Sequence, residues 1–326
     1  MIETPPQPPT LPTEPPPVVR PKPPRPSPIR TIAIYFFFIF IGAALIAPRL
    51  HASAQFLAQE ISPRFYWLAT QPFHRYVNRC LLILALIALP SFFKALGVRS
   101  IKDLGLPFTA RRCVESLQGF IWGFVTLAVA TALLAGSDIR VFDFEHSPAS
   151  WKNHFKNAAL AALVVAVIEE LIFRGAIFGA LRRSHRFWAA AILSSALYAL
   201  LHFFEKPENP RYIEWNSGLY VLADMLRGFT NWNTLIPAFL NLTLVGLLLA
   251  RAFDRTGSLY FSIGLHAGLV FWLKSFGFLT NPKLPNASSF WGTDKLVDGW
   301  ITTLVLGLLF LLIDRSSLAH QKPIEP

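Results

Sequence analysis

The stretch NAALAALVVAVIEELIFRGAIFGALRR at residues 157–183 decides the fold class, because an apolar run of membrane-spanning length carries three charged side chains. A helix needs about 20 mainly apolar residues to cross a hydrocarbon core of ~30 Å. Burying an ionised carboxylate or guanidinium in that core is costly unless the group is paired or hydrated. Glu169, Glu170 and Arg174 therefore require partners, a function, or both.

The rest of the chain repeats the apolar pattern. Hydrophobic residues make up 53% of the 326 residues, and the mean hydropathy is positive. Apolar runs of spanning length lie at residues 31–48, 79–97, 117–136, 157–180, 187–204, 234–253, 258–274 and 298–314. They predict an all-α, polytopic membrane helical bundle of about eight transmembrane helices.

The net charge of +11 is explained by topology and does not require a nucleic-acid partner. With a cytoplasmic N-terminus, the three inner loops carry nine Lys and Arg in 32 residues, whereas the four outer loops carry twelve in 103. This difference has the sign of the positive-inside rule. We therefore expect a multi-pass protein of the cell membrane, in contact with lipid, with both termini in the cytoplasm. Cys80 and Cys113 then lie on opposite sides, so no disulfide is expected.

Four regions are expected along the chain. Residues 1–30 hold 13 of the 26 prolines and predict a disordered cytoplasmic tail. Residues 31–154 form the N-terminal transmembrane helices and connectors, with an amphipathic connector at 98–116. Residues 155–275 form the catalytic core, whose longest loop holds a short helix near 217–228, and residues 276–326 form the last transmembrane helix and the C-terminal tail.

Two of the eight histidines, His202 and His266, fall inside apolar runs, and they join Glu169 as candidate site residues. Glu170 and Arg174 are four residues apart and can form an intrahelical ion pair. Glu169 is turned by about 100° from its neighbour and can face the bundle interior. Tyr198, four residues before His202, is expected to orient that histidine through its hydroxyl.

The chemistry of this set indicates amide hydrolysis. A carboxylate desolvated in a membrane cavity has a raised pKa and is a competent general base near neutral pH. Two imidazoles beside it can bind a divalent metal or donate hydrogen bonds to an oxyanion. Taken singly, an ion pair such as that of Glu170 and Arg174 is usually structural, and a lone histidine usually packs, so the inference depends on the whole set.

Three segments resemble a known family. EELIFR at 169–174 fits an EExxxR motif, YALLH at 198–202 is similar to FxxxH, and RTGSLYFSIGLHAGLVF at 255–271 resembles a third motif helix. Over about residues 155–275 the chain resembles the CPBP family (CAAX protease and bacteriocin-processing proteins, also called Abi), which includes the type II CAAX prenyl endopeptidases.

The resemblance implies an intramembrane endopeptidase acting on a membrane-associated peptide or protein, of CAAX type or another kind. By it, Glu169 activates water with help from His202, His266 stabilises the oxyanion, and Glu170 and Arg174 support the site. It leaves two mechanisms open. In a metalloprotease, Glu169, His202 and His266 would hold a divalent metal such as zinc; in a glutamate endopeptidase no metal takes part.

The chain departs from the family pattern at one position, and this departure motivates alternative functions. The family's last motif is HxxxN or HxxxD, but Val270 stands four residues after His266, and Asn241 is a candidate replacement. This departure motivates a second hypothesis, a non-catalytic membrane scaffold or self-immunity protein of the same fold. A third, an ion-coupled transporter with Glu169 as its proton site, is disfavoured because the sequence shows no internal repeat.

Overall fold

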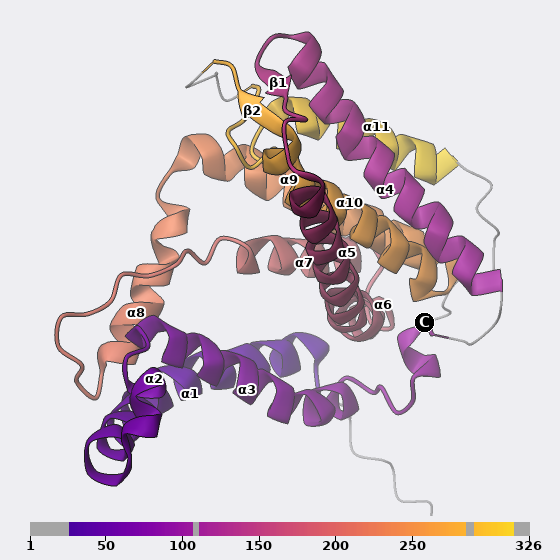
Figure 1. Cartoon of the computed structure of the whole chain (residues 1–326). Helices are drawn as coiled ribbons and strands as arrows, with labels where there is room; N and C mark the ends of the chain where they lie inside the picture. Colours follow the sequence, from indigo (N-terminus) through magenta and orange to yellow (C-terminus); the bar gives the residue numbers. More distant parts are fainter. Residues whose placement is uncertain (1–25, 107–110, 285–289, 316–326) are drawn as a thin grey trace, which may run out of the picture.

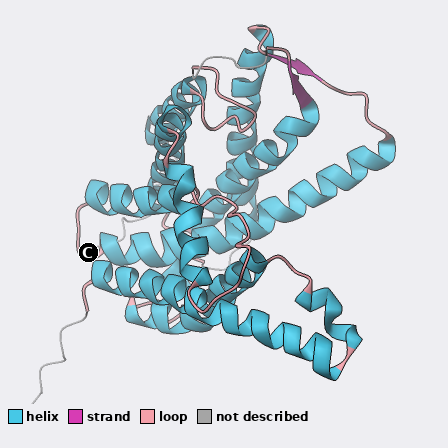
Figure 2. Cartoon of the chain, turned by 90° about the vertical axis from the view of Figure 1, so that its left-hand side faces the viewer, coloured by secondary structure: helices cyan, strands magenta, loops and turns pink. Residues whose placement is uncertain are grey.

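The computed structural model describes residues 26–106, 111–284 and 290–315. Nearly all of the described chain is helical, and the two short strands pair at one end of the molecule (Figure 2). The expected disorder of the proline-rich tail falls mostly on residues 1–25, outside the described residues.

A helix is present at each of the eight apolar runs. These helices are α1 (Pro28–Phe56), α3 (Phe73–Ala95), α4 (Arg111–Gly136), α5 (Pro148–Glu170), α7 (Phe187–Leu201), α9 (Trp232–Thr256), α10 (Leu259–Leu279) and α11 (Trp300–Arg315). The fourth run continues from α5 through a π-helix, η4 (Leu171–Phe178), into α6 (Gly179–Arg182).

Shorter elements connect them. They are the π-helix η1 (Leu57–Ile61), η2 (Pro63–Phe65), α2 (Tyr66–Ala69), η3 (Lys102–Leu104), β1 (Arg140–Phe142), α8 (Ser217–Met225), η5 (Leu226–Phe229) and β2 (Thr280–Pro282). The strands β1 and β2 are antiparallel, with Val141 opposite Asn281. The short helix expected near 217–228 is confirmed by α8 and η5.

The expected all-α polytopic membrane bundle is confirmed. Among the described residues, five helices are long and apolar enough to cross a membrane: Pro28–Ile61, Phe73–Ala95, Arg112–Gly136, Trp232–Thr256 and Leu259–Leu279. The other three runs differ because α7 has 15 residues, α11 has 16, and the fourth carries three charged residues, Glu169, Glu170 and Arg174. The cytoplasmic location of the termini stays a prediction.

The prediction of an amphipathic connector at residues 98–116 was only partly right. Its first part is irregular apart from η3, but α4 already begins at Arg111. Arg112 and Glu115 stabilise this early start by an ion pair of 2.7 Å across the first turn. Residues 107–110 lie outside the described residues.

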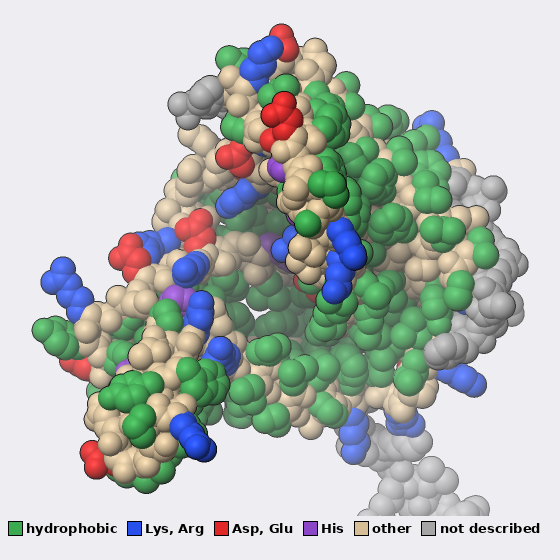
Figure 3. Space-filling view, viewed as in Figure 1, with side chains coloured by type: hydrophobic (Ala, Val, Ile, Leu, Met, Phe, Trp, Pro, Cys, Tyr) green, Lys and Arg blue, Asp and Glu red, His purple; other side chains and the backbone are tan. Residues whose placement is uncertain are grey.

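The helices form two groups around a central hollow. α1, α3 and α8 pack together, with Ala43, Ala47, Val77 and Val221 in their shared core. Figure 1 shows this group below the larger bundle formed by the other long helices. In Figure 3 the face between the two groups is hollowed, and hydrophobic side chains cover much of the surface on both sides of it.

A glycine contact fixes α10 against α4. The segments GFIWG (119–123) and GLHAG (264–268) each place two glycines one turn apart. A Cβ at any of these glycines would overlap the backbone of the facing helix, so only glycine allows the two backbones to come this close. His266 lies at the centre of GLHAG and is held in position by this contact.

Candidate active site

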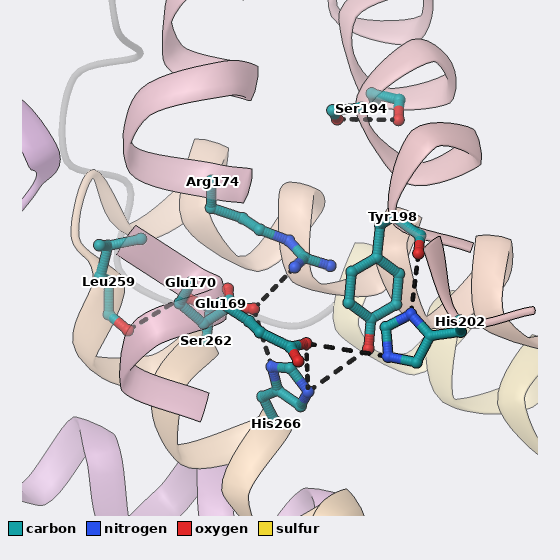
Figure 4. Close-up of polar contacts among 10 residues, drawn as sticks. Glu169, Glu170, Arg174, Ser194, Tyr198, His202, Leu259, Ser262 and His266 are labelled. Atoms are coloured by element: carbon teal, nitrogen blue, oxygen red, sulfur yellow. Dashed lines mark hydrogen bonds and ion pairs between the residues drawn. The ribbon is translucent and has the colours of Figure 1, made fainter. Parts of the chain in front are cut away.

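Three helices bring the candidate residues together. Glu169 and Glu170 end α5, Tyr198 is on α7, His202 directly follows α7, and His266 lies in the middle of α10 (Figure 4). α10 packs on both α4 and α5, and α7 packs on α9, where Gly246 leaves room for Ser195. The site is therefore built on packed helices, which hold its side chains more precisely than loops would.

Glu170 and Arg174 form a buried ion pair. The Arg174 Nη1 atom lies 2.9 Å from Glu170 Oε1, and the side chains are 2% and 0% exposed. Arg174 belongs to η4, the π-helix that starts directly after Glu170. The sequence predicted the pair from its spacing, but it gave no signal of the π-helix.

Glu170 also binds His266, a contact that the sequence did not reveal. The Nδ1 atom of His266 lies 3.0 Å from the same Glu170 oxygen, and the His266 side chain is 2% exposed. One carboxylate therefore neutralises Arg174 and fixes the orientation of the His266 ring. A supporting hydrogen bond of this kind sets which ring nitrogen carries the proton.

Glu169 faces the opposite way, towards both histidines. Its Oε2 atom lies 3.7 Å from His266 Nε2 and 4.0 Å from His202 Nε2. Its side chain is 25% exposed, and that of His202 is 35% exposed. Glu169 Oε2 is nevertheless locally buried and has no hydrogen-bond partner among the described residues. The structure thus brings Glu169, His202 and His266 together, while their roles stay predictions.

Tyr198 contacts both histidines, but not as expected. Its backbone carbonyl, and not its hydroxyl, accepts the hydrogen bond from His202 Nδ1 at 2.8 Å. The hydroxyl instead lies 3.4 Å from His266 Nε2. The expectation that the hydroxyl orients His202 was wrong, because on a helix the residue four positions later reaches the backbone carbonyl.

These hydrogen bonds determine which nitrogen of each imidazole carries a proton. A carbonyl or an ionised carboxylate only accepts hydrogen bonds, so the Nδ1 atoms of His202 and His266 carry their protons. In a neutral ring, Nε2 then has a lone pair, and both Nε2 atoms face the carboxylate of Glu169. Three electron-pair donors that converge in this way favour a proton, a water molecule or a cation between them.

Glu169, His202 and His266 are also of the residue types that would bind the metal implied by the resemblance. Two imidazoles and one carboxylate are ligands that zinc prefers, and the Nε2 atoms of both histidines and the unpaired Glu169 oxygen fit such an ion in kind. As the side chains stand, however, the described residues contain no group of three His, Cys, Asp or Glu spaced to hold a metal ion.

A cavity of about 90 Å³ lies at these residues. Its walls are mostly leucine and valine side chains from α4, α5, α9, α10 and α11. Within the described chain, its polar lining consists of Glu169, Tyr198, His202 and His266. An apolar cavity with a few convergent polar groups is the usual form of a small binding or active site.

Val270 and Asn241, the residues at which the chain departs from the family motif, lie in different surroundings. Val270 lines the cavity one turn after His266, so an apolar side chain stands where the family has an amide or acid. Asn241 does not replace it, because its amide nitrogen donates to the carbonyls of Val297 (2.7 Å) and Gly299 (3.0 Å). Asn241 instead holds the chain segment whose Val297 forms part of the cavity wall.

Comparison with known proteins gives one match. Residues 151–272 match a family model described as Type II CAAX prenyl endopeptidase Rce1-like. No curated protein and no solved structure matches the chain. The matched segment contains Glu169, Glu170, Arg174, Tyr198, His202 and His266. This match supports the resemblance of residues 155–275 to the CPBP family that the motifs indicated.

Proposed function

We propose that this protein is an intramembrane endopeptidase that hydrolyses a peptide bond with a water molecule activated by Glu169. The observation that carries the proposal is the unpaired Oε2 atom of Glu169, which faces the Nε2 atoms of His202 and His266. Glu170 is the other carboxylate in this span, and it is already bound to Arg174 and His266. Glu169 is thus the one of the pair that lines the cavity.

In the first step, Glu169 takes a proton from water while the water oxygen bonds to the peptide carbonyl carbon. The carbonyl π electrons move to the oxygen and form an oxyanion. The lone pair on His202 Nε2 accepts a hydrogen bond from the same water and orients it. When the intermediate collapses, the C–N bond breaks and Glu169 gives its proton to the leaving nitrogen.

His266 stabilises the oxyanion in this scheme. For this role the ring carries a proton on Nε2 as well as on Nδ1, whose N–H donates to the Glu170 carboxylate. The Nε2–H points into the cavity and can donate to the developing negative charge. Such a donor acts strongly because it is already oriented in a site with little water.

A divalent metal is compatible with the same residues. Glu169, His202 and His266 would hold it, and it would supply Lewis acidity for the carbonyl and the attacking water. Arg174 and Glu170 would keep their present roles, because they lie outside the set that faces the cavity.

The substrate class follows from the surroundings and from the family. The cavity is apolar and the molecule is embedded in lipid, so a membrane-associated peptide fits better than a freely soluble one. The family description makes a prenylated CAAX-type peptide the first candidate, and other membrane-associated peptides come second.

The decisive experiment compares purified wild-type protein with Glu169→Gln in lipid nanodiscs. Both are incubated with a farnesylated CAAX-type peptide and with a peptide library, with and without a chelator, and the products are identified by mass spectrometry. We expect cleavage by the wild type and its loss in Glu169→Gln, His202→Ala and His266→Ala. Glu145→Gln, at an exposed loop carboxylate, is the matched control. Full activity in Glu169→Gln would reject the mechanism.

The second candidate is a non-catalytic membrane scaffold or self-immunity protein of the same fold. The apolar Val270 in the cavity wall favours it, because an expected polar group is missing there. A cellular phenotype that persists in Glu169→Gln, together with no cleavage by the wild type, would support this alternative.

A further inference from the structure

We propose that the phenol of Tyr198 is a catalytic oxyanion donor, which supplies the hydrogen bond that Val270 cannot supply. This inference rests on the proposed function and assigns a further group to the same site. It starts from the polar lining of the cavity, in which Tyr198 is the one neutral O–H donor among the described side chains.

The tautomers of the two histidines leave few hydrogen-bond donors that face the cavity. The Nδ1 protons of His202 and His266 are directed to the Tyr198 carbonyl and to Glu170, away from the cavity. In their neutral forms both rings therefore present only lone pairs to a bound carbonyl. The Tyr198 hydroxyl is the side-chain O–H that lines the cavity and can donate to a bound carbonyl.

The position of the hydroxyl suits this role. It lies 3.4 Å from His266 Nε2, longer than a strong hydrogen bond, and it also interacts with the Glu169 carboxylate, so a developing oxyanion can compete with these acceptors for its proton. Figure 4 shows the hydroxyl between His202 and His266, on the side facing Glu169. An oxygen that accepts from both the phenol and His266 Nε2 would lie beside the carboxylate that activates the water.

The Tyr198 ring is held rigidly from two sides. The guanidinium of Arg174 lies 4.8 Å from its centroid, and the ring of Phe173 meets it edge-on at 5.2 Å. The residue is only 3% exposed. A donor fixed before the reaction avoids reorganisation.

Tyr198 keeps its proton throughout. Its O–H bond lengthens towards the oxyanion as charge develops, and the hydrogen bond weakens again when the C–N bond breaks. Because the interaction strengthens only in the transition state, its loss should lower kcat and leave KM nearly unchanged.

The test is Tyr198→Phe, which removes the hydroxyl and keeps the ring between Arg174 and Phe173. We expect kcat for a farnesylated CAAX-type peptide to fall by about 10²-fold. Tyr35→Phe is the matched control, because that buried tyrosine donates to the Ala85 carbonyl away from the site. The double variant Tyr198→Phe/Val270→Asn should recover part of the loss, since an amide at 270 would enter the same cavity.

A second measurement does not require turnover. A phosphonate analogue of the same peptide carries a charged tetrahedral group, and Tyr198→Phe should weaken its binding by about tenfold or more. Binding of the uncleaved peptide to Glu169→Gln should not change when Tyr198→Phe is added.

The outcomes separate the two proposals. If Glu169→Gln is inactive but Tyr198→Phe keeps full kcat and phosphonate affinity, the role of Tyr198 is wrong and the proposed function stands. A change in KM alone, without a loss of kcat, would show a structural role and would also overturn the inference. If the wild type neither cleaves the peptide nor binds the phosphonate, the proposed function itself fails.

Discussion

At the residue scale, two adjacent glutamates serve different purposes because a helix turns them apart. Glu170 is fully buried between Arg174 and His266, whereas Glu169 borders the cavity with an unpaired oxygen. A carboxylate with two cationic or donor partners contributes to stability. A carboxylate that borders the cavity is available for chemistry.

We therefore expect Glu170→Gln and Glu169→Gln to differ in stability. Glu170→Gln leaves the buried Arg174 charge uncompensated and should reduce the free energy of unfolding by about 3–5 kcal/mol. Glu169→Gln removes no hydrogen bond that the structure shows from Oε2, so its effect should be small. Thermal unfolding of both variants in the same detergent measures this difference. Equal losses of stability would contradict the division of roles.

At the element scale, the contact between α4 and α10 positions His266, and its glycines can be tested individually. Gly268 and Gly277 both lie on α10, but a Cβ at Gly268 would overlap the Phe120 backbone, whereas one at Gly277 would meet nothing within 4 Å. Gly268→Ala should destabilise the protein by about 1–3 kcal/mol through overpacking. Gly277→Ala should be neutral or stabilise it by up to about 1 kcal/mol.

Unfolding temperatures and peptidase activity of both variants check this prediction. Gly268→Ala should also lose activity, because a displaced α10 moves His266 away from Glu169. A Gly268→Ala protein with unchanged stability would show that the two helices are farther apart than the structure indicates.

A second contact between elements should depend on pH. The rings of His146 and His154 both stack on Phe278, each with a centroid distance of 4.0 Å, where the start of α5 meets the end of α10. His154 precedes the predicted span, and burial, with a smaller effect of His146, lowers the pKa of His154 below its ordinary value of 6.5. The unfolded chain then binds this proton more readily, so the stability from this contact is present above about pH 6.5 and decreases below it.

Thermal unfolding between pH 5 and 8 tests this expectation. The wild type should lose stability as the pH falls, and His154→Phe should lose less, because it keeps an aromatic ring that cannot be protonated. Asp143 lies 4.0 Å from His146 Nε2 and is expected to offset part of the charge on that ring. Identical pH profiles for both proteins would exclude His154 as the titrating group.

At the scale of the whole molecule, the sequence predicted what depends on local pattern. The apolar runs predicted the helices, and the spacing of Glu170 and Arg174 predicted their ion pair. The contact of His266 with Glu170 joins residues 96 positions apart, and no local pattern specifies which helices become neighbours. The π-helix after Glu170 and the direction of the Tyr198 hydroxyl were missed for the same reason, because tertiary packing determines both.

The orientation of the whole molecule in the membrane is the last prediction, and the two cysteines can test it. Cys113 is exposed near the start of α4 and is expected on the cytoplasmic side, whereas Cys80 is buried. A membrane-impermeant maleimide should therefore label the wild type in inverted vesicles and not in intact cells, and Cys113→Ser should remove the label. In that background, Glu145→Cys, at an exposed loop position, should be labelled only in intact cells. The reverse pattern would place the Lys-rich and Arg-rich loops outside, which would contradict the charge asymmetry and put both termini on the other side.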